Sequence, residues 1–266
     1  MLNTDVYKYA KNLSDYHLWW YEDEFFWYVW KNHGLATVFG KKYSLLDVLI
    51  DMSKKWSVTI DELEWKNAKL LSLVMWWLEI FGVEGELGLV NRLDNDTAGL
   101  VYFAKSQKIF DDYTLAQREA KVYKWYVVDV VIQWNMKHET WKMFTDECGW
   151  KKSQWWHMVW WPVYHHKHLQ DRMVVWKSPK DDGRVRWRRH LVETWWRVLD
   201  DSDCGNILTV LVCIQSWSRH QVRAHLASVG MPVVGDRLYG WENVFWKCDQ
   251  DESFLHLWSV GMEVGC

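Results

Sequence analysis

A ten-residue segment, Asn91 to Leu100, concentrates side chains that can do chemistry just before an apolar, strand-like run. It holds two carboxylates, Asp94 and Asp96, together with Arg92 and Thr97. An arginine beside a carboxylate favours the ionised form, which is the form that a nucleophile or general base requires. The same residue types also suit a polar turn in which Asp96 or Thr97 bonds to nearby backbone. The segment alone leaves both interpretations open.

A second polar segment follows more than a hundred residues later. Residues 218–226 read SRHQVRAHL, and residues 230–240 read GMPVVGDRLYG. Ser218 and Gln221 fit an S-x-x-Q capping box, which predicts a helix that begins there and ends near residue 230. On that helix Arg219 and Arg223 share a face, where like charges repel slightly, so a common anionic partner would explain them. Two solvated arginines are the alternative.

Together the two segments resemble the RluA-type family of RNA pseudouridine synthases. That family carries H-R-L-D-x-D-T-S-G-L, then H-Q-I-R-x-H-L, then G-x-P-(I/V)-x-G-D-x-x-Y-G. Three weaker similarities accompany them: VWKNHGL at 29–35 is similar to V-N-K-P-x-G-L, VYKWY at 122–126 to V-x-K-x-Y, and LHL at 255–257 to L-H-A. The resemblance covers the chain from about residue 20 onward, and several motifs in order are more specific than any one of them.

The resemblance implies an α+β fold: a single catalytic domain with a mixed, mainly antiparallel sheet, flanking helices and a central cleft. We expect an N-terminal arm at 1–20 and the catalytic domain at 21–266, with 135–193 as an insertion or loop region within it. Sequence patterns support these elements independently. Ser44 and Ser106 are N-cap candidates for helices. A further helix is expected at 60–77, and strands at 99–105, 123–132 and 207–214, which are rich in β-branched and aromatic residues.

The resemblance also assigns roles in converting uridine to pseudouridine. Asp94 is implied as the essential carboxylate, which either attacks C1′ or removes a sugar proton. Tyr126 is implied to stack on the target base and to assist proton handling at C5, the alternative being a core aromatic. Arg223 is implied as the counter-ion of Asp94. The expected substrate-binding residues are Arg92, Arg219, His220, Gln221, Leu238 and Tyr239.

Composition limits the partners and the class of protein. The 266 residues carry a net charge of −3, so an RNA site must come from local patches and not from a global basic field. One candidate patch is 177–189, with six basic residues around Trp187; a solvated hairpin loop is the alternative. The five cysteines are scattered and read as reduced thiols, and no signal or membrane-spanning pattern is present, which predicts a cytoplasmic protein.

Neither a cofactor nor a metal is expected. The isomerisation needs no redox change, and the chain lacks a phosphate-binding GxxxxGK[ST] loop and a GxGxxG motif. His165, His166 and His168 lack acidic or cysteine partners at ligand spacing, so a surface loop is the preferred interpretation. The expected partner is ribosomal or transfer RNA, bound by a monomer that does not associate with membranes.

The chain also departs from the family pattern. It has 24 tryptophans, and Trp27, Trp30 and Trp217 stand where the family has an aliphatic residue, asparagine and glycine. A large residue in a small site costs roughly 1–3 kcal/mol. Asn91 replaces the family's histidine, and Trp217-Ser218 replaces a Gly-Arg pair. An active synthase is therefore the first hypothesis, a catalytically impaired RNA-binding protein on the same scaffold the second, and a globular protein without an RNA role the third.

Overall fold

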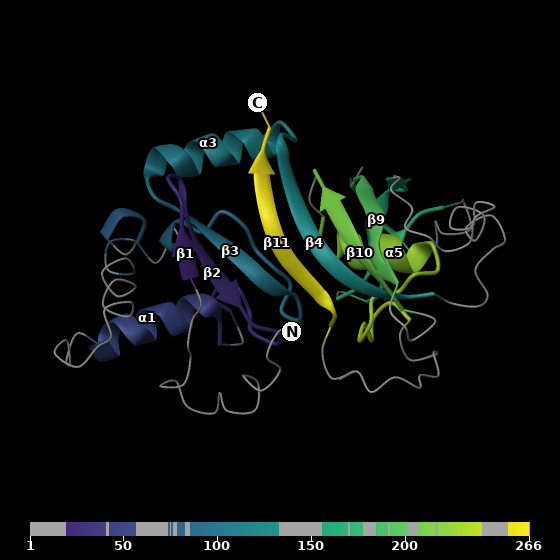
Figure 1. Ribbon diagram of the computed structural model, residues 1–266, viewed down its shortest axis with the longest axis horizontal. Coiled ribbons are helices and arrows are strands. Elements are labelled where there is room, and N and C mark those ends of the chain that lie inside the picture. The colour runs from purple at the N-terminus through teal and green to yellow at the C-terminus, as the bar shows by residue number, and fades with distance from the viewer. Residues whose placement is uncertain are drawn as a thin grey trace. The chain divides into compact units, whose positions relative to one another are not determined.

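The computed structural model describes residues 20–40, 43–56, 74, 76, 79–82, 86–132, 156–169, 171–177, 185–190, 192–201, 207–215, 218–240 and 255–265. Apart from Trp20, the expected arm at 1–20 lies outside these residues. The chain divides into two units, residues 1–114 and 115–266. Figure 1 shows the helices and strands of each unit. The expected domain limits at residues 21 and 266 stay a prediction.

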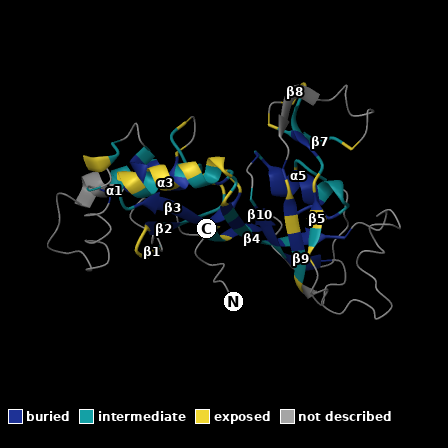
Figure 2. Ribbon diagram, turned by 90° about the horizontal axis from the view of Figure 1, so that it is seen from above, coloured by how far each residue is buried: buried dark blue, intermediate teal, exposed yellow. Residues whose placement is uncertain are grey.

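In the first unit three antiparallel strands form a sheet in the order β1 (Trp20–Glu22), β2 (Phe26–Lys31) and β3 (Ala98–Ala104). β3 is buried along its whole length, as its apolar sequence predicts. Helix α3 (Gln107–Arg118) places Tyr113 edge-on to Phe26 with ring centroids 6.1 Å apart. That contact packs the apolar side of α3 on β2, while its other residues are half-buried or exposed, as Figure 2 shows.

Both predicted N-caps in this unit are confirmed. Ser44 precedes α1 (Leu45–Trp56); its Oγ accepts from the Asp47 backbone N–H at 3.2 Å, and the Asp47 carboxylate accepts from the Ser44 N–H at 2.9 Å. This reciprocal pair satisfies two donors that a helix start leaves unpaired. Ser106 Oγ accepts from the Ile109 N–H at 3.3 Å at the start of α3. The helix expected at 60–77 lies outside the described residues except at 74 and 76.

The second unit contains a five-stranded sheet in which every pairing is antiparallel. Its order is β11 (Leu257–Val264), β4 (Val122–Val131), β10 (Ile207–Ile214), β9 (Thr194–Asp201) and β5 (His157–Val159). The central strand β4 alternates between buried and half-buried residues over most of its length, as expected for a strand inside a sheet. The predicted strands at 123–132 and 207–214 and the mainly antiparallel arrangement are confirmed.

The region expected as an insertion or loop, 135–193, is more ordered than predicted. Its described residues include β5 and a second sheet in the order β7 (Met173–Val175), β6 (Val163–His166) and β8 (Val185–His190). This small sheet packs on helix α5 (Gln221–Ser228), where Val163, Met173 and Ala224 share one buried cluster. The sequence patterns did not reveal these strands: β5 pairs with β9 and β6 with β8 over long separations, and β6 also pairs with β7 across a short connection. The expected limits of the insertion stay a prediction.

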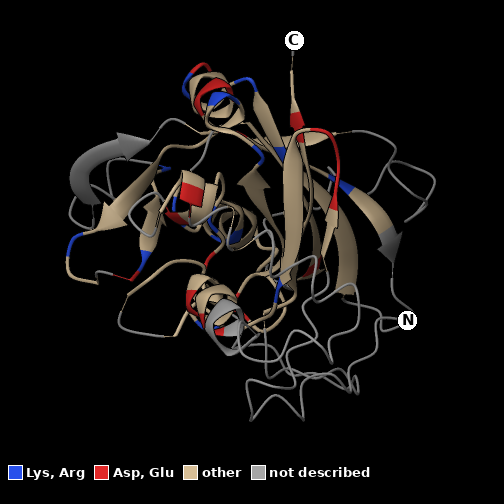
Figure 3. Cartoon of the chain, turned by 90° about the vertical axis from the view of Figure 1, so that its left-hand side faces the viewer, with Lys and Arg blue, Asp and Glu red and all other residues tan. Residues whose placement is uncertain are grey.

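Acidic and basic residues are interspersed over the described elements and do not form one continuous field (Figure 3). This distribution agrees with the net charge of −3. Any RNA contact must therefore depend on local groups of cations. Among the described residues no helix has the length and apolar character needed to cross a bilayer.

Candidate active site

Asp94 lies in a short turn that runs directly into β3. The Thr97 backbone N–H donates to the Asp94 carbonyl at 3.0 Å and closes the turn. Thr97 and the following residue, Ala98, are buried, whereas the Asp94 side chain is half-buried and Asp96 is exposed. The turn therefore keeps the Asp94 carboxylate accessible at the end of a fully buried strand.

The buried lysine of β2 holds this turn. Lys31 has no exposed surface, and its ammonium donates to the carbonyls of Asn32 at 3.0 Å, Leu35 at 2.7 Å and Asn95 at 3.0 Å. Burial lowers the pKa of Lys31 to about 7, against the opposing effect of the negative charges on Asp96 and Asp94. Because Asn95 follows Asp94 directly, Lys31 fixes the backbone next to the candidate catalytic carboxylate.

Thr37 and Asn91 fix the approach to the same turn. Thr37 Oγ1 donates to the Leu93 carbonyl at 2.7 Å and accepts from the Leu93 N–H at 3.1 Å, so it satisfies both backbone groups of the residue before Asp94. The Asn91 side chain donates to the Leu100 carbonyl at 3.2 Å and accepts from the Tyr102 N–H at 2.7 Å. Asn91 thus extends the hydrogen-bonding edge of β3, a local role that does not need the family's histidine.

Arg92, expected to contact RNA, lies on the surface of the first unit. Its guanidinium forms an ion pair with Glu86 at 2.5 Å, and the two side chains are 56% and 27% exposed. At this exposure the pair contributes little stability, so Arg92 can exchange Glu86 for another anion at small cost. The RNA contact of Arg92 stays a prediction.

Tyr126 lies in β4 of the second unit with 6% of its surface exposed. It pairs with Val212 of β10 on one side and with Ser259 of β11 on the other. The register of β11 shifts between Ser259 and Gly261, directly beside Tyr126. Such bulges re-aim side chains and occur often beside active sites. Both the catalytic role and the core-aromatic alternative remain compatible with this position.

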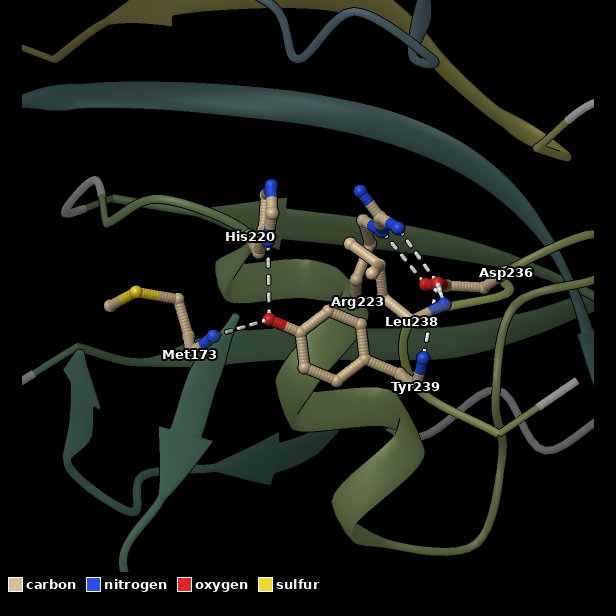
Figure 4. Close-up of polar contacts among 6 residues, drawn as sticks. All are labelled: Met173, His220, Arg223, Asp236, Leu238 and Tyr239. Carbon is tan, nitrogen blue, oxygen red and sulfur yellow. Dashed lines mark hydrogen bonds and ion pairs between the residues drawn. The ribbon is translucent and has the colours of Figure 1, made fainter. Parts of the chain in front are cut away.

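Arg223 has a carboxylate partner that the sequence did not predict. Its Nε donates to Asp236 Oδ2 and its Nη2 to Asp236 Oδ1, both at 2.7 Å (Figure 4). The Arg223 side chain is 4% exposed and that of Asp236 is fully buried. Asp236 Oδ1 also accepts from the N–H groups of Leu238 at 3.0 Å and Tyr239 at 3.3 Å. The predicted pairing of Arg223 with Asp94 would join the two units and stays a prediction.

Tyr239 connects three parts of the second unit. Its hydroxyl accepts from the Met173 N–H at 2.8 Å and lies 3.2 Å from His220 Nδ1 (Figure 4). Burial, followed by the charges of Arg223 and Arg219, lowers the pKa of His220 to about 3, and burial raises the pKa of Tyr239 to about 12. Both side chains are therefore neutral between pH 5 and 9, and their contact is one between neutral groups.

Helix α5 begins later than the capping box predicted. The Ser218 N–H donates to the Gln221 side-chain oxygen at 3.0 Å, which is half of the expected box. The N-cap, however, is His220 at φ 54°, and the first helical residue is Gln221. Within the described part of the chain Ser218 Oγ has no hydrogen-bond partner. Arg219 consequently lies in the turn before α5, and the prediction that it shares a helix face with Arg223 was wrong.

The other two expected substrate-binding residues have structural contacts in the second unit. Gln221 is buried, and its amide nitrogen donates to the Glu193 carbonyl at 2.8 Å and to Thr194 Oγ1 at 3.2 Å. Leu238 is half-buried in the turn that Asp236 holds. Gln221 therefore positions the start of α5 on β9, and an additional RNA contact by either residue stays a prediction.

Three residues of the site were missed from the sequence: Lys31, Thr37 and Asp236. Lys31 and Asp236 stand in the family motifs V-N-K-P-x-G-L and G-x-P-(I/V)-x-G-D, which was an available signal. Thr37 had no signal, because its partner Leu93 is 56 residues away. Within the described residues no group of three or more His, Cys, Asp or Glu side chains could hold a metal ion.

Comparison with known proteins adds evidence independent of this geometry. Residues 80–228 match the model of the family described as RNA pseudouridylate synthase. An uncharacterized RNA pseudouridine synthase of Aquifex aeolicus is 30% identical over 164 residues, which cover 62% of this chain and 43% of the relative. Ribosomal large subunit pseudouridine synthase D of Blochmanniella floridana is 24% identical over 175 residues, covering 66% and 45%. The chain thus spans less than half the length of these relatives.

Solved structures agree on the fold. Human RNA pseudouridylate synthase domain containing 1 has a TM-score of 0.56 at 15% identity, covering 93% of this chain and 78% of the human chain. Human RNA pseudouridylate synthase domain containing 4 has a TM-score of 0.53 at 17% identity, covering 91% and 82%. These similarities confirm the expected α+β fold. Because the family model matches more than half of the 266 residues, including Asp94, Tyr126 and Arg223, the chain belongs to the RNA pseudouridylate synthase family.

Proposed function

We propose that this protein isomerises specific uridines of ribosomal or transfer RNA to pseudouridine, with Asp94 as the catalytic carboxylate. The observation that carries the proposal is the Asp94 turn itself. It lies inside the family match, and its backbone is fixed by Lys31 and Thr37. A carboxylate whose backbone is held in this way is suited to act as a nucleophile or base at a defined atom.

The reaction conserves every atom of the nucleotide. The N1–C1′ bond breaks, the base rotates, a C5–C1′ bond forms, and the proton lost from C5 is balanced by one gained at N1. Asp94 either attacks C1′ directly or removes a sugar proton, and both routes need it ionised. No oxidation state changes, so the proposal includes no cofactor and no metal. The protein is proposed to act as a monomer.

Two residues of the second unit are proposed to support Asp94. Tyr126 would stack on the uracil ring and assist the proton transfer at C5. Arg223 would favour the ionised form of Asp94 by its positive charge. Because Arg223 pairs bidentately with Asp236, its guanidinium plane is already oriented, which lowers the entropy lost when it meets a second anion.

The target uridine must leave the base stack before C1′ becomes accessible. Unstacking costs a few kcal/mol and costs least in loops and other single-stranded sites. The names of two relatives, ribosomal large subunit pseudouridine synthase D of Blochmanniella floridana and of Nitrosomonas europaea, favour large-subunit ribosomal RNA as the first substrate to test. Arg92, Arg219, His220, Gln221, Leu238 and Tyr239 are proposed to contribute to binding this RNA.

The test is pseudouridine formation by the purified protein on unmodified large-subunit ribosomal RNA and transfer RNA. Asp94→Asn should lower the rate by at least about 10²–10⁴-fold without changing the midpoint of thermal unfolding. Asp112→Asn, which removes the same charge from the exposed face of α3, is the matched control and should remain active. RNA binding by a folded wild-type protein that forms no pseudouridine would favour the catalytically impaired RNA-binding alternative.

A further inference from the structure

A pocket of about 550 Å³ lies in the second unit between α5 and the small sheet of β6 and β7. A volume of this size falls in the range of small-ligand sites and holds more than a few water molecules. Its polar lining consists of side chains from two regions of the sequence, residues 166–177 and 228–239: His166, Arg172, Lys177, Ser228 and Tyr239. The sheet that forms one wall belongs to the region that the sequence analysis expected to be an insertion or loop.

The described lining carries positive charge without a carboxylate. Arg172 and Lys177 are cations, and the remaining lining residues are neutral or imidazole side chains. The guanidinium carbon of Arg172 lies 5.5 Å from the centroid of the Tyr239 ring, and that of Arg223 lies at the same distance. Arg223 already pairs with the Asp236 carboxylate, whereas Arg172 meets the ring face, which orients a guanidinium without cancelling its charge.

The other two donors are also held in place. His166 Nδ1 accepts from the backbone N–H groups of His168 at 3.1 Å and Leu169 at 3.0 Å, so the neutral ring carries its proton on Nε2, as a donor. The Lys177 ammonium donates to the Ser228 carbonyl and lies 4.7 Å from the Trp161 ring centroid. The carbonyl end of α5 is negative, and the Lys177 ammonium offsets part of that charge at the edge of the pocket.

We propose that this pocket binds a phosphate group, supplied by the backbone of the bound RNA. The RNA part rests on the proposed function, whereas the phosphate chemistry rests on the pocket alone. A planar guanidinium matches two phosphate oxygens at once, which assigns Arg172 as the main contact and Lys177 and His166 as supporting donors. Tyr239 belongs both to this pocket and to the turn that Asp236 holds. A phosphate bound at Arg172 therefore anchors the RNA one side chain away from Arg223.

The first experiment measures binding of a fluorescein-labelled 20-nucleotide single-stranded RNA across a range of salt concentrations. Arg172→Gln should weaken binding about tenfold at low salt, the usual effect of losing a charged hydrogen bond. It should also reduce the slope of log affinity against log salt by about 0.7, the value for one phosphate contact on a single strand. Arg118→Gln on the exposed end of α3 is the matched control and should change neither quantity.

The second experiment titrates inorganic phosphate into the same proteins and follows the ring resonances of Tyr239 by NMR. Wild-type protein should show saturable shifts that Arg172→Gln abolishes and that Arg172→Lys shows only at higher phosphate concentration, because lysine keeps the charge without the planar pair of donors. Phosphate binding that depends on Arg172, combined with unchanged RNA binding, would identify free phosphate as the occupant and overturn RNA as its source. If Arg172→Gln fails to fold, Lys177→Gln takes its place in both experiments.

Unchanged RNA affinity, salt slope and phosphate shifts in a folded Arg172→Gln protein would overturn the proposal. Pseudouridine formation by the wild type is assayed in parallel, so that the two proposals fail separately. Arg172-dependent binding without pseudouridine formation would support the phosphate site and contradict the proposed function. Pseudouridine formation with binding that does not depend on Arg172 would support the proposed function and contradict the phosphate site.

Discussion

The turn that presents Asp94 and the turn that holds Arg223 fix a charged residue in opposite ways. At the first, side chains from elsewhere bind backbone: Lys31 contacts the Asn95 carbonyl, and Thr37 contacts both backbone groups of Leu93. At the second, side chain binds side chain, because the Asp236 carboxylate accepts hydrogen bonds from two nitrogens of Arg223. The contacts at the first turn thus fix the backbone beside Asp94, whereas those at the second fix the guanidinium of Arg223.

This difference predicts different consequences of mutation. Removing a group that braces backbone leaves unpaired neutral polar atoms, which cost about 1–3 kcal/mol each when buried. Removing one member of a buried ion pair leaves an uncompensated charge, which costs about 3–5 kcal/mol. Substitutions at the Asp94 turn should therefore lower activity more than stability. Substitutions in the pair of Arg223 and Asp236 should lower stability first.

The largest expected effect is that of Asp236→Ala. It leaves the 4%-exposed Arg223 without its bidentate partner and frees two backbone N–H groups in the following turn. The free energy of unfolding should fall by about 3–5 kcal/mol in urea titrations. Asp112→Ala is the matched control, because its pair with Lys108 is exposed, 62% for the aspartate and 84% for the lysine, and should contribute little to stability. Equal losses in the two variants would contradict a buried, mutually dependent pair.

The second effect is a pH dependence at Lys31. Its pKa is lowered by burial to about 7, whereas in the unfolded chain it returns to about 10.4. Between these values the unfolded state binds the extra proton, so the free energy of unfolding rises with pH. The slope reaches about 1.4 kcal/mol for each pH unit. Lys31→Met should remove this rise, so the wild type should gain stability relative to the variant from pH 7 to pH 9.5.

Urea unfolding of wild type and Lys31→Met at half-unit pH steps measures that difference directly, because all other titrating groups are common to both proteins. A difference that is constant over the window would mean that Lys31 is charged in the folded protein throughout. Lys105→Met, which removes an ammonium that pairs with Glu22 at 2.8 Å, with the two side chains 22% and 32% exposed, is the control for the loss of a lysine elsewhere in the same unit.

Elements that depend on neighbours in sequence were predicted well. The caps at Ser44 and Ser106 bond to groups three residues away, and β10 is apolar at every position except Thr209. The strands of 135–193 were missed: β5 pairs with β9 and β6 with β8 across long separations, and the short-range pair of β6 with β7 was not predicted either. Long-range pairing is set by the fold, and the periodic pattern of one strand does not identify the strand with which it pairs.

The candidate site residues show the same difference between local and long-range information. The family motifs predicted Asp94, Tyr126 and Arg223, because the resemblance implies a chemical role for each of them. What the sequence could not provide is the set of contacts that hold them: Thr37 bonds to a residue 56 positions away. Asp236 stands in a family motif, but the sequence did not indicate that it pairs with Arg223. Which carboxylate an arginine binds depends on geometry that only the folded chain defines.

Thr37→Val should show the third effect. Valine keeps the shape of threonine but leaves the Leu93 N–H and carbonyl without their partner. The free energy of unfolding should fall by about 2 kcal/mol, and pseudouridine formation should fall by a larger factor than RNA binding, because the backbone before Asp94 loses its fixed position. Thr114→Val is the matched control, since its hydroxyl bonds only to a carbonyl within α3. Activity that follows stability equally in both variants would contradict a positioning role.

The smallest effect is expected for Tyr239→Phe, which keeps the ring between Arg172 and Arg223 and removes only the hydroxyl. The Met173 N–H and His220 Nδ1 lose one partner, at a cost of about 1 kcal/mol. Because the pKa of His220 is lowered to about 3, the ring is neutral in both proteins and the loss should be the same at pH 5 and pH 8. Urea titrations at the two pH values test this. A loss that changes between them would show that His220 takes up a proton when the hydroxyl is absent, so that Tyr239 helps to keep the imidazole neutral beside Arg223.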